Sequence, residues 1–260
     1  MVTNNKDVKF NWSIFLYEMI CTALLLVIGL SFVTIMFGAG SPVEKLIPDL
    51  GIRRIITGFL FGSTGALIAI SPLGTVSGAH VNPVVSMVFW LFQKIDKKTA
   101  ASYILGQFTG ALIGCLPLLA WGEMGRSVEF GATTPGHGYS LYTVLLGEVA
   151  TTFTMVSLLI LFLAFRKLRP YTPAIFPFLY SIMSYLEAAI SGVSTNPARS
   201  LGPSVISGQW SGWWIYWIGP VAGALLAALS MSFFAKRITE ARLYHFDNES
   251  DRLFRNKIIQ

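Results

Sequence analysis

The chain has 260 residues, of which 53% are hydrophobic and only 12% are charged, and its mean hydropathy is +0.61. Soluble domains carry about 25% charged residues, so this composition excludes an ordinary soluble protein and predicts one embedded in a membrane. The formal net charge is +6, but the basic residues form no patch of the kind that binds nucleic acid, and we expect no nucleic-acid partner.

Six apolar segments are predicted to cross the membrane, since a span needs about 20 residues to cross a hydrocarbon core of about 30 Å. They lie at residues 12–37, 55–70, 100–121, 142–165, 175–190 and 213–234. The first contains Glu18 and shows no small-residue cleavage site, so we expect a retained span and not a signal peptide. The predicted fold class is an all-α membrane protein with six transmembrane helices.

Two further apolar stretches, 82–92 and 196–206, are too short to span a bilayer. At about 1.5 Å per residue, ten helical residues cover roughly 15 Å, which is half of the hydrocarbon core. Asn is a preferred N-cap and Pro is favoured at the first position of a helix. We therefore predict two re-entrant half-helices, which start at Asn82-Pro83-Val84 and Asn196-Pro197-Ala198.

Most lysines and arginines lie on one side of the predicted spans. Fourteen of the 19 fall in the stretches 6–9, 94–98, 166–169 and 236–257. Basic residues concentrate in cytoplasmic loops, so we expect both termini in the cytoplasm. No targeting segment is recognised, and we expect the protein in a plasma membrane or a bacterial inner membrane. The polar end of the chain is expected to be a solvated helix or a loose extension.

The two halves of the chain repeat one another. Glu18 and Thr22 in the first span match Glu148 and Thr152 in the fourth, and the stretch 77–83 before the first half-helix matches 191–197 before the second. We place repeat one at about 12–121 and repeat two at about 140–234. Three spans per half is an odd number, so the halves have opposite topology and share a site at the bilayer midplane.

Opposite topology brings the N-termini of the two half-helices together near the bilayer centre. Each N-terminus is equivalent to roughly +0.5 charge, and irregular backbone at this depth is tolerated only where it is buried in protein or lines a cavity. Such a cavity repels cations and offers Asn82 and Asn196 amide donors to a passing oxygen atom. The pattern therefore predicts a pore for neutral molecules that excludes protons and ions.

These residues resemble the aquaporin (major intrinsic protein) family over residues 12–234, and the water-channel branch in particular. The resemblance rests on the Glu18/Thr22 and Glu148/Thr152 pairs, the stretch 77–84, and the stretch 196–200. It implies a channel domain at 12–234 between a cytoplasmic N-terminus at 1–11 and a cytoplasmic tail at 235–260. It also implies a homotetramer in the lipid bilayer with one pore per subunit. The sequence shows no His/Asp/Glu cluster, no nucleophile with its base and no metal-ligand spacing, so we expect no enzymatic activity, no metal and no cofactor.

The resemblance further implies a selectivity filter on the outer side of the pore centre. It assigns Arg199 as the filter cation, Val193 as a backbone carbonyl, and Phe61 as the filter aromatic, with Gly62 as the alternative. An Arg placed this deep is costly and by default functional. At the fifth-span position, where water-selective members often have His, counting back from Asn196 leads to Ser184 or, with one gap, to Tyr185. Ser would widen the constriction, and Tyr would narrow it.

Several other positions bear on substrate and gating. Ser200 and the pair Tyr216-Trp217 resemble the water branch and not the glycerol branch, whereas Val84 replaces a more usual Ala. His80 is predicted to line the cytoplasmic mouth, either as a neutral hydrogen-bonded residue or as a pH-responsive gate.

Glu18 and Glu148 are expected to be structural carboxylates that accept hydrogen bonds from the connectors before the half-helices. Glu187 has no counterpart in the first half. The alternatives are a glycerol, ammonia or small-solute facilitator of the same fold, and a secondary transporter with inverted repeats, for which Glu187 is the one unpaired coupling carboxylate.

Overall fold

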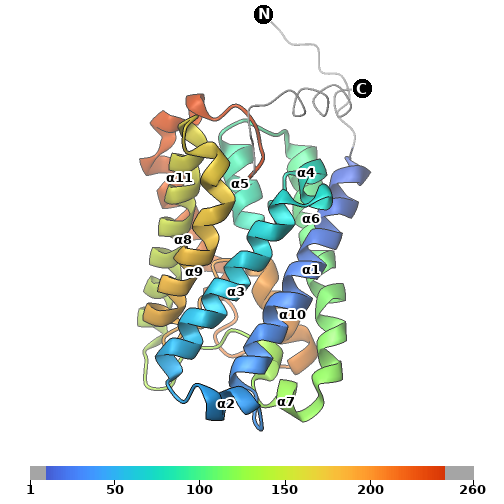
Figure 1. The fold of residues 1–260 in the computed structure, drawn as a ribbon. Helices are drawn as coiled ribbons and strands as arrows, with labels where there is room; N and C mark the ends of the chain where they lie inside the picture. Colours follow the sequence, from blue (N-terminus) through green and yellow to red (C-terminus); the bar gives the residue numbers. More distant parts are fainter. Residues whose placement is uncertain (1–9, 244–260) are drawn as a thin grey trace, which may run out of the picture.

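The computed structural model describes residues 10–243. In this part of the chain six long helices form a bundle (Figure 1): α1 (Trp12–Phe37), α3 (Leu50–Ile70), α6 (Lys97–Cys115), α8 (Leu141–Ala164), α9 (Thr172–Glu187) and α11 (Ile215–Ser230). Four helical stretches, including Lys97–Arg126, are long and apolar enough to cross a membrane by length and composition. The prediction of an all-α membrane fold with six spans is confirmed.

Two shorter helices enter the bundle from opposite ends: α5 (Pro83–Leu91) and α10 (Pro197–Ser207). Figure 1 shows α5 near the end where α1 begins and where the described chain stops, which we call the terminal end. It shows α10 near the opposite end, which we call the far end and which also holds the short helices α2 (Pro42–Leu46) and α7 (Gly122–Arg126). These are the two half-helices predicted from the paired Asn-Pro sequences.

The long helices pack in pairs that follow the repeat: α1 with α6, α8 with α11, and α3 with α9. Glycines bring the backbones of each pair together. A Cβ atom at Gly106 or Gly110 of α6 would collide with the carbonyl oxygen of Phe15 or Met19 in α1, and one at Gly223 of α11 would collide with α8 at the Val149 carbonyl oxygen. Small residues at helix contacts permit this close approach, on which helix association in a bilayer depends.

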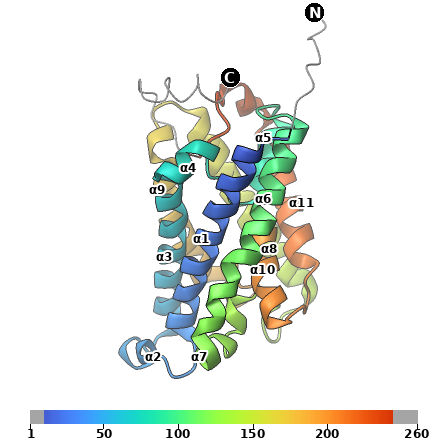
Figure 2. The same cartoon turned by 90° about the vertical axis from the view of Figure 1, so that its right-hand side faces the viewer.

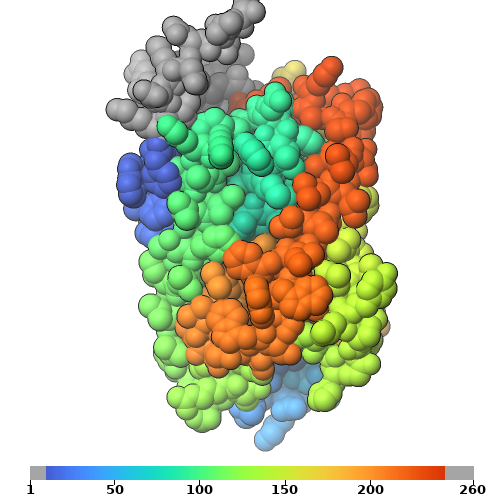
Figure 3. Space-filling view, turned by 180° about the vertical axis from the view of Figure 1, so that it is seen from behind, coloured from blue at the N-terminus to red at the C-terminus, as the bar shows by residue number. Residues whose placement is uncertain are grey.

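The outward faces of the bundle carry large apolar side chains. Leu67, Phe178 and Leu229 are each more than 60% exposed in the isolated chain, as expected of a surface that faces lipid. Seen from behind (Figure 3), the orange block of the second repeat that includes α11 lies between the green of α6 and the yellow-green of α8. Figure 2 shows the same bundle from the side, with α1 and α6 running alongside each other.

The structure corrects one expectation about the end of the chain. After α11 the chain forms the 3-10 helix η4 (Ser232–Arg237) and then runs back over the bundle without regular secondary structure. Ile238 and Leu243 are 3% and 4% exposed, so the chain up to Leu243 is attached to the bundle and is not loose, whereas η4 itself has no buried residue. Residues 1–9 and 244–260, which include most of the expected N-terminal and C-terminal extensions, lie outside the described residues.

Candidate functional site

A buried carboxylate of α1 holds the connector that precedes α5. Glu18 is fully buried and accepts hydrogen bonds from the Ser77 hydroxyl at 2.6 Å, the His80 backbone N–H at 3.0 Å and the Val81 backbone N–H at 2.8 Å. Connector N–H groups within a membrane have few other partners. Glu18 therefore satisfies the backbone donors of a non-helical segment and fixes its position.

Glu148 of α8 does the same for the connector that precedes α10. It accepts from the Ser191 hydroxyl at 2.5 Å, the Ser194 N–H at 2.7 Å and the Thr195 N–H at 2.9 Å. Each donor occupies the same place relative to its Asn as its counterpart in the first repeat. The internal repeat is thus a repeat of hydrogen bonds as well as of sequence.

Both connectors adopt backbone conformations that side chains rarely take. Positive φ angles occur three residues and one residue before each Asn, at Ala79, Val81, Val193 and Thr195, with values from 44° to 53°. A non-glycine residue in such a region costs on the order of 1–3 kcal/mol and persists only where the surroundings hold it. The hydrogen bonds to Glu18 and Glu148 keep the two connectors in these conformations.

The two Asn side chains cap their own half-helices and reach across to the opposite connector. The Asn82 amide nitrogen donates to the Thr195 carbonyl at 2.9 Å, and the Asn196 amide nitrogen donates to the Val81 carbonyl at 2.8 Å. Their side-chain oxygens accept from the first N–H groups of α5 and α10. A side-chain amide has two N–H groups, so one on each Asn remains for a molecule in the cavity that both side chains line.

Two cavities meet along the bundle axis. The outer cavity, of about 270 Å³, lies toward the far end between residues such as Phe37, Leu50 and Val128. The inner cavity, of about 50 Å³, is lined by both Asn side chains and His80. A water molecule occupies about 30 Å³ in the liquid, so the inner cavity accommodates one or two.

Phe61, Tyr180 and Arg199 line both cavities and form the constriction between them. The Arg199 guanidinium is 7% exposed, donates to the Gly131 carbonyl at 2.6 Å, and lies 5.7 Å from the centre of the Phe61 ring. The Phe61 and Tyr180 rings are 6.0 Å apart, and the Tyr180 hydroxyl hydrogen-bonds the Thr195 hydroxyl at 2.7 Å. One fixed cation and two aromatic rings therefore surround the narrow part.

The structure corrects the expectation of which fifth-span residue lies at the constriction. Ser184 lines the outer cavity, one helical turn from Tyr180, whereas Tyr185 is 53% exposed and lines neither cavity. Tyr185 is therefore removed as a candidate, and Tyr180, which counting back from Asn196 did not reach, is added. The spacing along the sequence could have indicated Tyr180, because Tyr180 and Ser184 are four residues apart and so lie on one face of α9.

The remaining candidates divide between the cavities and the packed interior. Val193 lines the outer cavity, and Gly62 lines the inner one beside Phe61. Val84 and Ala198 are buried at the half-helix tips and line neither cavity, so Val84 fills the packing between elements. Glu187 is buried and lies against Gly147 of α8 without lining the outer cavity.

His80 is held rigidly at the inner end. Its ring lies between Phe89 and Tyr103, with centroids at 4.6 and 4.0 Å. Its Nε2 atom is 3.0 Å from the Ala241 carbonyl, and its Nδ1 atom is 3.0 Å from the Ser86 hydroxyl. A carbonyl only accepts, so Nε2 donates, and Nδ1 accepts from Ser86 in the neutral ring. These contacts agree with the expectation of a neutral, hydrogen-bonded lining residue.

The family model described as Major intrinsic protein matches residues 4–231 of this chain. The chain belongs to the major intrinsic protein family. Its similarity to individual members of the family is moderate: it is 31% identical to Aquaporin-4 of Mus musculus over 83% of this chain, and 30% identical to Aquaporin AqpM of Methanothermobacter marburgensis over 78% of this chain.

The match covers 65% of the mouse relative's length and 93% of the archaeal one, so the chain spans less than two thirds of the mouse protein. Among solved structures, the aquaglyceroporin of Plasmodium falciparum aligns with a TM-score of 0.65 at 18% identity, covering 87% of this chain and 96% of that one. At that identity the likeness shows the major intrinsic protein fold alone.

Proposed function

We propose that the chain is a passive channel for water that excludes protons and ions. The observation that supports this most directly is the meeting of α5 and α10, with Asn82 and Asn196 on the wall of a cavity large enough for one or two waters. Two helix N-termini there are each equivalent to roughly +0.5 charge, and Arg199 adds a full charge at the constriction. A cation meets a barrier, whereas a neutral water finds donors.

The filter residues follow from the constriction. Arg199 donates to the passing molecule and repels cations, Phe61 and Tyr180 limit its size, and the Val193 carbonyl and Ser184 contact it in the outer cavity. The outer cavity is about five times the volume of the inner one, so selection takes place at the constriction and not at the mouth. Larger neutral solutes such as glycerol are expected to pass more slowly than water.

Placement and assembly complete the proposal. The basic stretches at 94–98 and 166–169 lie at the terminal end of the bundle, which supports a cytoplasmic location for that end. The chain belongs to the major intrinsic protein family, and on the resemblance to that family we propose a homotetramer with one pore per chain, in a plasma membrane or a bacterial inner membrane. The channel needs neither a cofactor nor a metal, and it carries out no catalysis.

The test is flux in liposomes that contain the purified chain, measured by stopped-flow light scattering after an osmotic step. We expect water permeability above that of empty liposomes and a smaller increase for glycerol. Glycerol permeability that rises as much as water permeability would favour the small-solute facilitator, and saturable uptake coupled to an ion gradient would favour the transporter.

A further inference from the structure

The segment after η4 has no regular secondary structure and crosses the terminal end of the bundle, beside the inner cavity. We call residues 238–243 the strap. Leu243 is 4% exposed and lines the inner cavity together with His80, Val81 and Asn82. It also belongs to the same apolar cluster as Val85 and Met155. A side chain from the end of the chain therefore forms part of the pore wall.

One main-chain and one side-chain hydrogen bond join the strap to the connector before α5. The Leu243 N–H donates to the Gly78 carbonyl at 3.1 Å, and the Ala241 carbonyl accepts from the His80 ring at 3.0 Å. A Cβ atom at Gly78 would lie 2.7 Å from the Ala241 carbonyl oxygen. The strap thus rests directly on the segment whose carbonyls and N–H groups build the pore.

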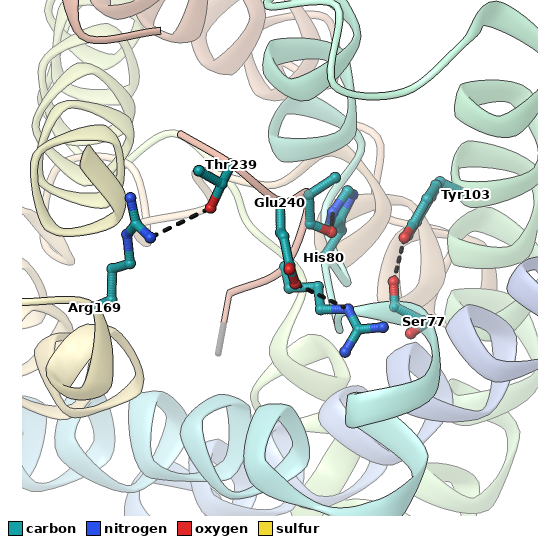
Figure 4. A network of polar contacts seen from close by, with 8 residues as sticks. Ser77, His80, Tyr103, Arg169, Thr239 and Glu240 are labelled. Carbon is teal, nitrogen blue, oxygen red and sulfur yellow. Dashed lines mark hydrogen bonds and ion pairs between the residues drawn. The ribbon is translucent and has the colours of Figure 1, made fainter. Parts of the chain in front are cut away.

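Polar side chains fix the strap further along (Figure 4). Arg169, between α8 and α9, donates to the Arg237 carbonyl at 2.7 Å and to the Thr239 hydroxyl at 3.3 Å. Within the strap, Arg242 and Glu240 form an ion pair at 3.9 Å. On the other side, Tyr103 donates to the Ser77 carbonyl and stacks on His80. The strap is anchored from two elements that are far apart in the sequence.

We propose that the strap closes the channel at the terminal end, with Leu243 as the plug, and that water passes freely only when the strap is displaced. This inference rests on the proposed water channel. Ile238 and Leu243 are the buried residues of the strap and belong to the apolar cluster of the bundle, whereas Thr239 is exposed and Arg242 is half-buried. Displacing the strap withdraws these two side chains from the cluster and leaves the helix pairs in place, so the strap is a built-in inhibitory contact.

The test compares full-length variants in liposomes by osmotic water flux per protein. Leu243→Ala shortens the plug, and Leu243→Asp places a charge against the apolar cluster that includes Val85 and Met155, where its burial is unfavourable. Leu229→Ala is the matched control, because Leu229 is 72% exposed on the outward face of α11. We expect both Leu243 variants to conduct about tenfold more water than the parent, which corresponds to about 1.4 kcal/mol in the closing equilibrium.

The outcomes separate the strap from the channel. If the parent conducts and the Leu243 variants match it, the water channel stands and the strap proposal is overturned. If neither the parent nor any variant exceeds empty liposomes, the proposed function fails and the strap proposal fails with it, since releasing the plug should open the pore.

A second measurement is independent of flux. Leu243→Cys should react with a bulky thiol reagent at least tenfold more slowly than Lys236→Cys, which is exposed on η4, a difference that again corresponds to about 1.4 kcal/mol. The native Cys21 and Cys115 are buried and serve as the background. Equal labelling rates at positions 243 and 236 would overturn the closed strap.

Discussion

Removing the Glu148 carboxylate tests whether the connectors depend on it. In Glu148→Ala, the Ser191 hydroxyl and the N–H groups of Ser194 and Thr195 lose their acceptor. All three residues are at most 2% exposed, so bulk water does not reach them. Each buried donor left unpaired costs about 1–3 kcal/mol, or roughly 3–9 kcal/mol for the three, with the lower end favoured because a hydroxyl can turn to another partner.

The assay is thermal unfolding in detergent, with water flux in liposomes as the functional readout. Glu148→Gln keeps one acceptor oxygen, so its melting temperature should fall between those of the parent and Glu148→Ala. Glu123→Ala is the matched control, because the Glu123 side chain is 85% exposed, and it should melt like the parent. If Glu148→Ala melts together with Glu123→Ala and conducts water normally, the carboxylate does not hold the connector and the reasoning is refuted.

Two further substitutions follow from the packing and the constriction. Gly110→Ala should lower the melting temperature, because its Cβ would collide with the Met19 carbonyl and overpacking of this kind reduces the free energy of unfolding by about 1–3 kcal/mol. Gly65→Ala is the control, because its Cβ would meet only Leu25 at 3.8 Å. Equal melting temperatures of the two variants would contradict the close α1–α6 contact. Arg199→Val should raise glycerol and cation permeability about tenfold, a change equivalent to about 1.4 kcal/mol in barrier, and unchanged solute ratios in reconstituted liposomes would remove Arg199 from the filter.

The sequence was sufficient for the parts of the molecule that depend on local rules and on duplication. Asn is preferred at the N-cap and Pro at the first position of a helix, which indicated helix starts at Asn82-Pro83 and Asn196-Pro197, and their repeat within an odd number of spans determines their opposite entry. Glu18 and Glu148 stood out because a paired carboxylate within a membrane span needs a partner, and the structure places each against its connector.

The sequence did not determine features that depend on how segments pack. Counting residues along the fifth span reached Ser184 and Tyr185, but rotation of α9 about its axis decides which side chains reach the axis of the bundle, and Tyr180 is the one at the constriction. Likewise, Ile238 and Leu243 are isolated apolar residues in a polar stretch, without helical or strand periodicity. Only the arrangement of the connector and α9 shows that they are buried.

The central claim is a pore for water that rejects charge, and paired water and proton flux tests it most directly. Liposomes with the Leu243→Ala chain should be studied so that the strap does not mask conduction, alongside the parent and empty liposomes. We expect an osmotic step to produce fast shrinkage while an imposed pH gradient decays no faster than in empty liposomes. Water permeability equal to that of empty liposomes, or a pH gradient that collapses with the water flux, would contradict the account.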